Sequence, residues 1–266
     1  MTDTQLTFFP PTPNRADAIA AGFRFGHIGT HTSRTIMVPD LAAVFAAVPV
    51  NSSRSDYASA IIERNCLGKP TVSTRRLSNQ RLGELYGLDP SLPVFRILRR
   101  LWRMPEAGHG LLSLLVALAR DPLLMFTAPV IISLPDGAEF QRRHTKTALE
   151  EAVGDRLNEA TLNKVVRNAA SSWSQSVHLE GRTFKFRRLV RATPGALALS
   201  LYLANAAGLR GNNLLTSGWV RVLDCSLATA KELALEAKRL GLIDLRMAGD
   251  VVEFGLSRLD PAVGRS

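Results

Sequence analysis

A chain of 266 residues, 46% of them apolar, can form one large domain or two to three small ones and can bury an ordinary core, which excludes a disordered polymer. Its 33 lysines and arginines against 23 acidic residues give a formal net charge of +10. This excess favours a polyanionic partner, nucleic acid before an acidic membrane surface. A soluble basic protein without a specific anionic partner is the alternative.

The positive charge is concentrated in two blocks. Residues 51–103 carry ten basic and four acidic side chains, and residues 140–191 carry eleven and five. Residues 1–50 are neutral and residues 104–139 are slightly acidic. Clustered charge is better evidence for a binding face than the total, so a polyanion is expected at one or both blocks.

Residues 1–50 are predicted to be an N-terminal extension of unknown role. The opening MTDTQLTFFPPTPNR lacks the basic start and apolar core of a signal peptide, so none is expected. His27 and His31 stand four residues apart in GHIGTH, a spacing that could hold a metal ion on a helix. Two glycines argue against a helix there and no third ligand is evident, so we predict neither a metal site nor a cofactor.

A helix-turn-helix is predicted next, within a segment of residues 51–137. Ser53 or Ser55 can cap a first helix, and Ser73 or Thr74 can cap a second. The outward side of the second helix carries residue types that reach base edges or phosphates: Arg75, Arg76, Asn79 and Gln80. A helical hairpin with a solvated polar face is the alternative. The apolar run LLSLLVALARDPLLMFTAPVIISL is interrupted by Arg120, Asp121 and two prolines, which favours two buried helices over a membrane crossing.

Residues 138–266 are predicted to be a tandem winged-helix-like region. A short helix, HTKTALEEAV, precedes a second helix that Asn158 caps, and a hairpin follows from about Val177 to Val190. The second helix is apolar on one side. Its other side carries the candidate DNA contacts Lys164, Arg167, Asn168 and Ser171, together with Gln175.

The hairpin is predicted to be the wing, which lies against the sugar-phosphate backbone. Its candidate phosphate contacts are Arg182, Lys185, Arg187 and Arg188. The alternative is that Phe184 and Phe186 pack inward while the arginines keep an edge strand soluble.

The same order of elements recurs after Thr193, which caps a helix that begins at Pro194. A short helix, a helix capped by Ser226 and a hairpin over residues 242–256 follow. Because the exposed helix face mixes acidic and basic residues, we expect a protein-contact or structural role for this copy. The predicted fold is mainly α, a helical bundle with helix-turn-helix or winged-helix modules and two short β-hairpins.

No sequence signature of catalysis is present. The chain has no G-x-x-x-x-G-K loop, no H-E-x-x-H and no nucleophile elbow. Cys66 and Cys225 are isolated and are expected to be reduced thiols in a cytoplasmic protein. We therefore predict that the protein is not an enzyme.

Several stretches resemble the BrxA-like family of bacteriophage-exclusion (BREX) defence systems. They are IIERNCLGKPTVSTRRLSNQRLGELYGL, RILRRLW with LLSLLVALARDPLL, TLNKVVRNAASSWSQSVHLEGR, and the helix start at Arg191-Ala192-Thr193-Pro194. The resemblance covers roughly residues 51–256. It implies a mainly helical fold, DNA binding, and an accessory role beside the methyltransferase and ATPase of a defence system. The family has also been compared with an RNA-binding antitermination factor, which keeps RNA open as a ligand.

Three functions are therefore carried forward. The first is non-enzymatic binding of duplex DNA; the second is a scaffold that contacts other defence-system proteins; the third is RNA binding. Few exposed aromatic residues are expected beside the basic ones, and readers of single strands usually stack bases on such rings. The sequence therefore favours duplex DNA and predicts no membrane partner.

Overall fold

The computed structural model describes residues 8–9, 12–13, 15–26, 29–104, 108–248 and 251–263. These residues are mainly helical, and they include two separate two-stranded antiparallel sheets. The predicted mainly helical fold with two short hairpins is confirmed. One hydrophobic cluster extends from Phe8 to Leu259, so all three predicted segments of the chain contribute to the same core.

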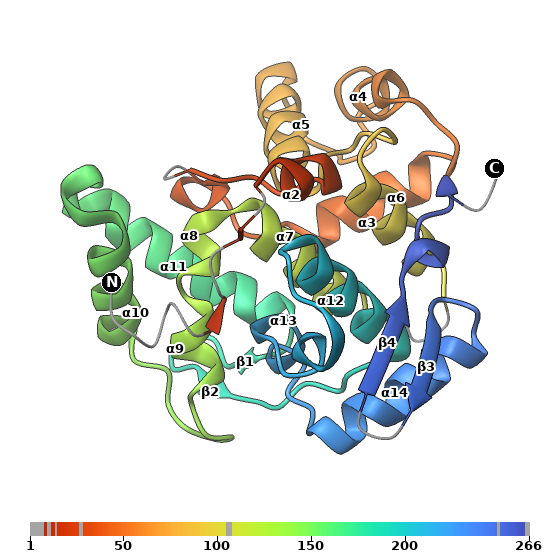
Figure 1. Ribbon diagram of the computed structural model, residues 1–266. Coiled ribbons are helices and arrows are strands. Elements are labelled where there is room, and N and C mark those ends of the chain that lie inside the picture. Colours follow the sequence, from red (N-terminus) through yellow and green to blue (C-terminus); the bar gives the residue numbers. More distant parts are fainter. Residues whose placement is uncertain are drawn as a thin grey trace.

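Helix α7 (His109–Arg120) forms the centre of the molecule (Figure 1). Every residue from Leu111 to Arg120 is buried, because α7 packs against α5, α12 and several further helices. A helix that is apolar on all sides is typical of such a position. The apolar run continues into α8 (Pro122–Met125) and α9 (Ala128–Ile132), so it forms three short helices where two were predicted.

Among the residues that the structure describes, no single helix is long and apolar enough to cross a membrane. One bent pair in the described part of the chain, His109–Arg120 and Pro122–Ile132, passes that test together, and its two members are bent by 109°.

The N-terminal residues take part in the core. They form α2 (Arg15–Ala21), the 3-10 turn η1 (Thr30–Thr32) and α3 (Val38–Ala47). Ile36, Leu41 and Val44 are fully buried, α3 packs on α4 and α7, and η1 packs on α11. The segment predicted as an extension therefore covers helices that are distant in the sequence.

The first predicted helix pair consists of α4 (Arg54–Ile62) and α5 (Val72–Tyr86), followed by α6 (Pro93–Leu101). Ser53 caps α4 as predicted, in a capping box with Asp56. Helix α5 is capped by Thr71 and not by Ser73 or Thr74. Its buried face packs on α7 and on α4, which leaves the polar face outward.

The second unit consists of two helices followed by a short hairpin, in the predicted order. It comprises α10 (Arg142–Val153), η2 (Gly154–Arg156), α11 (Glu159–Gln175), β1 (Leu179–Glu180) and β2 (Phe186–Arg187). Strand β2 pairs with β1 on one side. On its other side it pairs with the segment before α10, through hydrogen bonds between Arg187 and Ala138 and between Phe140 and Lys185. The sequence did not predict this third, edge segment.

The third unit follows in the predicted order. It comprises α12 (Pro194–Ala206), η3 (Gly211–Leu214), α13 (Gly218–Arg221), α14 (Leu227–Arg239), β3 (Asp244–Ala248), β4 (Val251–Gly255) and η4 (Ser257–Leu259). Thr193 and Ser226 cap α12 and α14 as predicted. The second hairpin is confirmed within residues 242–256, and its turn residues Gly249 and Asp250 lie outside the described residues. In Figure 1, α10 lies at one side of the molecule and α14 at the other.

Candidate nucleic-acid interface

The polar side of α11 is divided into a free half and an occupied half. Lys164 and Arg167, in the N-terminal half, are exposed, and their side chains form no hydrogen bond or ion pair with a described residue. In the C-terminal half, the Asn168 side-chain amide donates a hydrogen bond to the His31 carbonyl oxygen at 2.8 Å. The Gln175 side chain accepts one from the Val38 amide at 2.9 Å. Asn168, predicted as a base contact, is instead a packing residue for the N-terminal segment.

A row of polar residues on α11 leads from Lys164 to the hairpin. Lys164, Arg167, Ser171 and Ser174 are spaced by three or four residues, so they follow one side of the helix over about 15 Å. At the end of this row, the Lys185 ammonium donates hydrogen bonds to Ser174 Oγ at 2.7 Å and to the Gly181 carbonyl oxygen at 3.0 Å. The hairpin and the helix therefore share one surface.

Several basic side chains of this surface have no ion-pair partner among the described residues. Arg142, at the start of α10, and Arg182, in the hairpin, are exposed and have no ion-pair partner among the described residues. Burial, and after it the charge of Arg142, lower the pKa of the Lys185 ammonium below its ordinary value. A bound anion would relieve that repulsion. We call Arg142, Lys164, Arg167, Arg182 and Lys185 the basic ridge.

Arg187 does not belong to the basic ridge. Its side chain is fully buried, forms an ion pair with Asp224, and donates a hydrogen bond from Nε to the Ile131 carbonyl oxygen at 3.0 Å. The predicted phosphate contact is thus an internal anchor between the hairpin and the loop before α14. Arg188 is exposed but is paired with Glu180 at 2.6 Å, which leaves it less available than Arg182.

The aromatic residues of the hairpin face solvent. The exposed fractions are 66% for Phe184 and 39% for Phe186, so the inward packing considered as an alternative does not occur. The hairpin therefore buries Arg187, which was predicted to contact phosphate, and exposes the two aromatic rings that the alternative interpretation placed inward.

The first basic block forms a different kind of surface. Arg75 donates a hydrogen bond to the Ile62 carbonyl oxygen at 2.8 Å, which ties α5 to the end of α4. Asn79 and Gln80 line a pocket of about 310 Å³ between these helices. Among the predicted residues of α5, only Arg76 is exposed without a partner in the described part of the chain.

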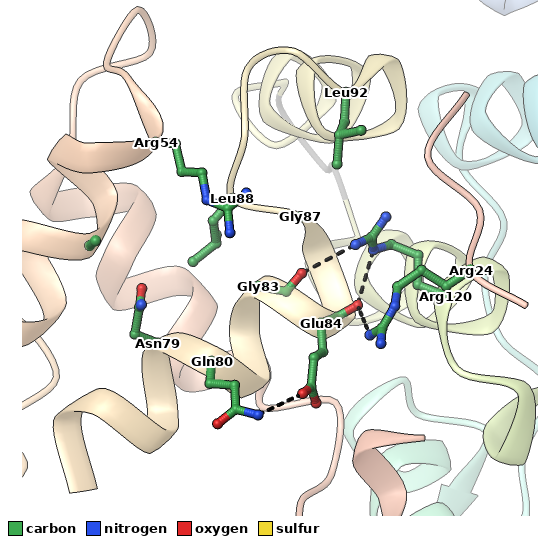
Figure 2. Close-up of a pocket in the computed structure, with 11 residues that line it drawn as sticks. Arg24, Arg54, Asn79, Gln80, Gly83, Glu84, Gly87, Leu88, Leu92 and Arg120 are labelled. Carbon is green, nitrogen blue, oxygen red and sulfur yellow. Dashed lines mark hydrogen bonds between the residues drawn. The ribbon is translucent and has the colours of Figure 1, made fainter. Parts of the chain in front are cut away.

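Figure 2 shows that two arginines of this pocket point toward the C-terminal end of α5. Arg24 and Arg120 both donate to the Glu84 carbonyl oxygen, at 3.0 and 3.1 Å, where helix carbonyls carry partial negative charge. Burial, and after it the charge of Arg24, lower the pKa of Arg120 to about 10. Because these cations are occupied by backbone oxygens, the basic ridge is the better candidate for a polyanion.

A buried cluster beside α11 has the spacing of a nucleophile triad. His31 Nδ1 lies 2.7 Å from Asp121 Oδ2, and His31 Nε2 lies 2.7 Å from Ser172 Oγ. Ser172 Oγ also donates to the Asn168 carbonyl oxygen at 2.8 Å and accepts from the Ile36 amide at 3.0 Å. With all three side chains buried and the hydroxyl fully engaged, the cluster fastens the N-terminal segment to α11. Nothing in the sequence marks it, because its members are 51 to 141 residues apart.

Of the two histidines considered as metal ligands, the structure describes only His31. His31 is held in this cluster, and His27 lies outside the described residues. Within the part of the chain that the structure describes, no group of three or more histidine, cysteine, aspartate or glutamate side chains could hold a metal ion.

Replacing Ser172 with alanine should lower the free energy of unfolding by about 1–3 kcal/mol, because the Ile36 amide and His31 Nε2 would each lose their buried hydrogen-bond partner. Urea unfolding followed by circular dichroism measures the change. The neighbouring Ser171→Ala is the matched control, since Ser171 has no hydrogen bond to a described residue and is only half-buried. Equal stabilities for the two variants would contradict a fastening role for Ser172.

Neither a scan against protein-family models nor a search of curated proteins finds a match to this chain. The functional conclusion therefore rests on the charge, exposure and hydrogen bonding of its own residues.

Proposed function

We propose that the protein is a non-enzymatic nucleic-acid-binding protein that binds duplex DNA through the basic ridge. The observation that carries this proposal is a set of exposed basic side chains with no carboxylate partner among the described residues: Arg142, Lys164, Arg167 and Arg182. A fold of this size does not need such charge for its own stability. Release of counterions from DNA phosphates would make binding at this surface favourable.

The arrangement also fits the shape of a duplex. The side of α11 that carries Lys164 and Arg167 is exposed, and the major groove of a duplex admits an α-helix. Arg167 could then meet a guanine edge, while Arg182 and Lys185 on the hairpin meet phosphates. The resemblance of residues 51–256 to the BrxA-like family is the basis for proposing that the duplex is bound within a phage-defence system, beside other proteins of that system.

A scaffold role is the second candidate, and α14 is the observation that favours it. Leu227, Leu235 and Leu240 are 48%, 43% and 51% exposed on or next to this helix. Scattered exposed leucines are ordinary, but three along one helix of the third unit provide apolar area for another protein. This surface lies on a different unit from the basic ridge, so the two functions are compatible.

The proposal is tested by salt titrations of binding to duplex DNA, single-stranded DNA and structured RNA. Lys164→Ala/Arg167→Ala and Arg182→Ala should each weaken duplex binding. The log–log salt slope should become shallower by roughly 0.9 for each phosphate that the variant no longer neutralises. If Arg167 meets a base, its replacement should also change sequence preference by about 1–3 kcal/mol.

Arg239→Ala is the matched control, because Arg239 is exposed and unpaired among the described residues but lies on α14. Arg239→Ala should change the duplex affinity and the salt slope only slightly, because it removes one charge that is distant from the basic ridge. If the ridge variants and Arg239→Ala behave alike, binding depends on net charge only and the basic ridge is not the interface. Tighter binding of structured RNA than of duplex DNA would mean that the ligand is RNA and not duplex DNA.

A further inference from the structure

The hairpin between β1 and β2 holds an aromatic ring in solvent. Phe184 is 66% exposed, and its neighbours Phe186 and Leu189 are 39% and 60% exposed. Burial of a phenylalanine side chain is normally favourable. The fold leaves this ring exposed to solvent, on a surface that also carries the basic ridge. Contact with an external partner would bury it.

The loop that presents Phe184 has a fixed conformation. Gly181 has a φ of +111°, and a Cβ atom at this position would lie 2.0 Å from the Phe184 carbonyl oxygen, so the turn requires glycine. The Lys185 ammonium closes the loop by donating a hydrogen bond to the Gly181 carbonyl oxygen at 3.0 Å, and it also donates to Ser174 Oγ on α11. The backbone that carries the ring is therefore held in place before any ligand arrives, which reduces the entropic cost of binding.

The charges around the Phe184 ring indicate which chemical class of partner would bind there. Arg182 is exposed and has no partner among the described residues, and Lys185 lies close enough to Arg142 for the charge of Arg142 to lower the Lys185 pKa. A ring beside uncompensated cations suits a nucleotide, whose base offers a flat face and whose phosphate offers negative charge. An apolar protein surface would leave these cations without partners.

The two parts of the surface fit different forms of nucleic acid. The free half of α11 suits the groove of a duplex, whereas a stacking ring needs a base face that is not covered by the next base pair. We infer that the ligand is a junction, duplex DNA continued by an unpaired strand, in which Phe184 stacks on the first unpaired base. This inference rests on the proposed function and names its substrate class.

The test compares the full-length protein on a blunt duplex and on the same duplex with a single-stranded overhang that has 2-aminopurine as its first unpaired base. The wild type should bind the junction about 5- to 100-fold more tightly than the blunt duplex, the range expected for stacking of one base. The 2-aminopurine fluorescence should be quenched on binding. Phe184→Ala should reduce junction affinity to the blunt-duplex value without changing the salt slope.

Leu189→Ala is the matched control, because it removes exposed apolar area from the same hairpin without removing a ring. It should keep the junction preference, and Phe184→Trp should keep it too. Equal binding of both DNAs by the wild type would overturn the inference and leave the proposed function standing. Equally weakened junction binding in Phe184→Ala and Leu189→Ala would indicate general apolar contact, as with a protein partner, and would also overturn it. Absence of binding to either DNA would reject the proposed function itself.

Discussion

Replacing Arg187 with alanine should lower the free energy of unfolding by about 3–5 kcal/mol. The Arg187 guanidinium is fully buried and forms an ion pair with Asp224, whose side chain is 4% exposed. Without the arginine, the Asp224 carboxylate would remain in the protein interior with no opposite charge. The Ile131 carbonyl oxygen would also be deprived of its hydrogen bond from Arg187 Nε.

The measurement is urea or thermal unfolding of matched variants. Arg188→Ala is the control, since it removes a neighbouring arginine whose ion pair with Glu180 is exposed to solvent and therefore contributes little to stability. The double variant Arg187→Met/Asp224→Leu should be more stable than Arg187→Ala, because it removes both charges together. If Arg187→Ala unfolds at the same urea concentration as Arg188→Ala, the pair does not anchor the hairpin.

Because of this ion pair, Arg187 is unsuitable for testing whether the hairpin contacts DNA. A variant of Arg187 would bind DNA less well through partial unfolding, and the effect would be mistaken for a missing phosphate contact. Arg182 is suitable for the purpose because it is exposed and has no partner in the described part of the chain.

The features that could be predicted from the sequence are local ones. Asn158, Thr193 and Ser226 were expected to cap helices and do so, because a cap depends on the residues within one turn of it. Both hairpins were also placed correctly from alternation and glycine. Where several hydroxyl residues stand together, local rules do not choose among them, and the cap of α5 is Thr71 and not Ser73.

The features that could not be predicted depend on distant residues. The sequence shows that Arg187 is charged, but its burial depends on Asp224, 37 residues away. In the same way, the helical spacing of Asn168 shows a polar face, but not that residues 31–38 cover part of it. Lys164 and Arg167 remain exposed because α10 packs against the apolar side of that half of α11 and leaves the polar side in solvent. Helical periodicity shows which residues share a face of a helix, but tertiary contacts determine whether that face is exposed to solvent or packed against protein.

Acidification from pH 6.5 to about pH 4 should destabilise the fold through His178, which lies beside Arg187 and Asp224. The His178 ring is fully buried, Nε2 donates to the Val222 carbonyl oxygen at 2.8 Å, and Nδ1 lies 2.9 Å from Ser176 Oγ, from which it can accept in the tautomer that is protonated on Nε2. This tautomer satisfies both nitrogens with the ring neutral. Burial, assisted by the charge of Arg187 and opposed by Val222 and Asp224, lowers the pKa of His178 from 6.5 to about 4.

The direction of the effect follows from proton uptake. Below pH 6.5 the unfolded chain binds a proton at residue 178, while the folded protein does not until the pH approaches about 4, so stability falls as the pH falls through this window. At about 1.4 kcal/mol for each pH unit, the destabilisation reaches about 3 kcal/mol at pH 4. Urea unfolding at several pH values between 7 and 4.5 measures it, above the range in which carboxylates dominate. His178→Gln should remove most of this pH dependence, whereas His144→Gln, at an exposed position, should keep it. An unchanged pH dependence in His178→Gln would mean that another group takes up the proton.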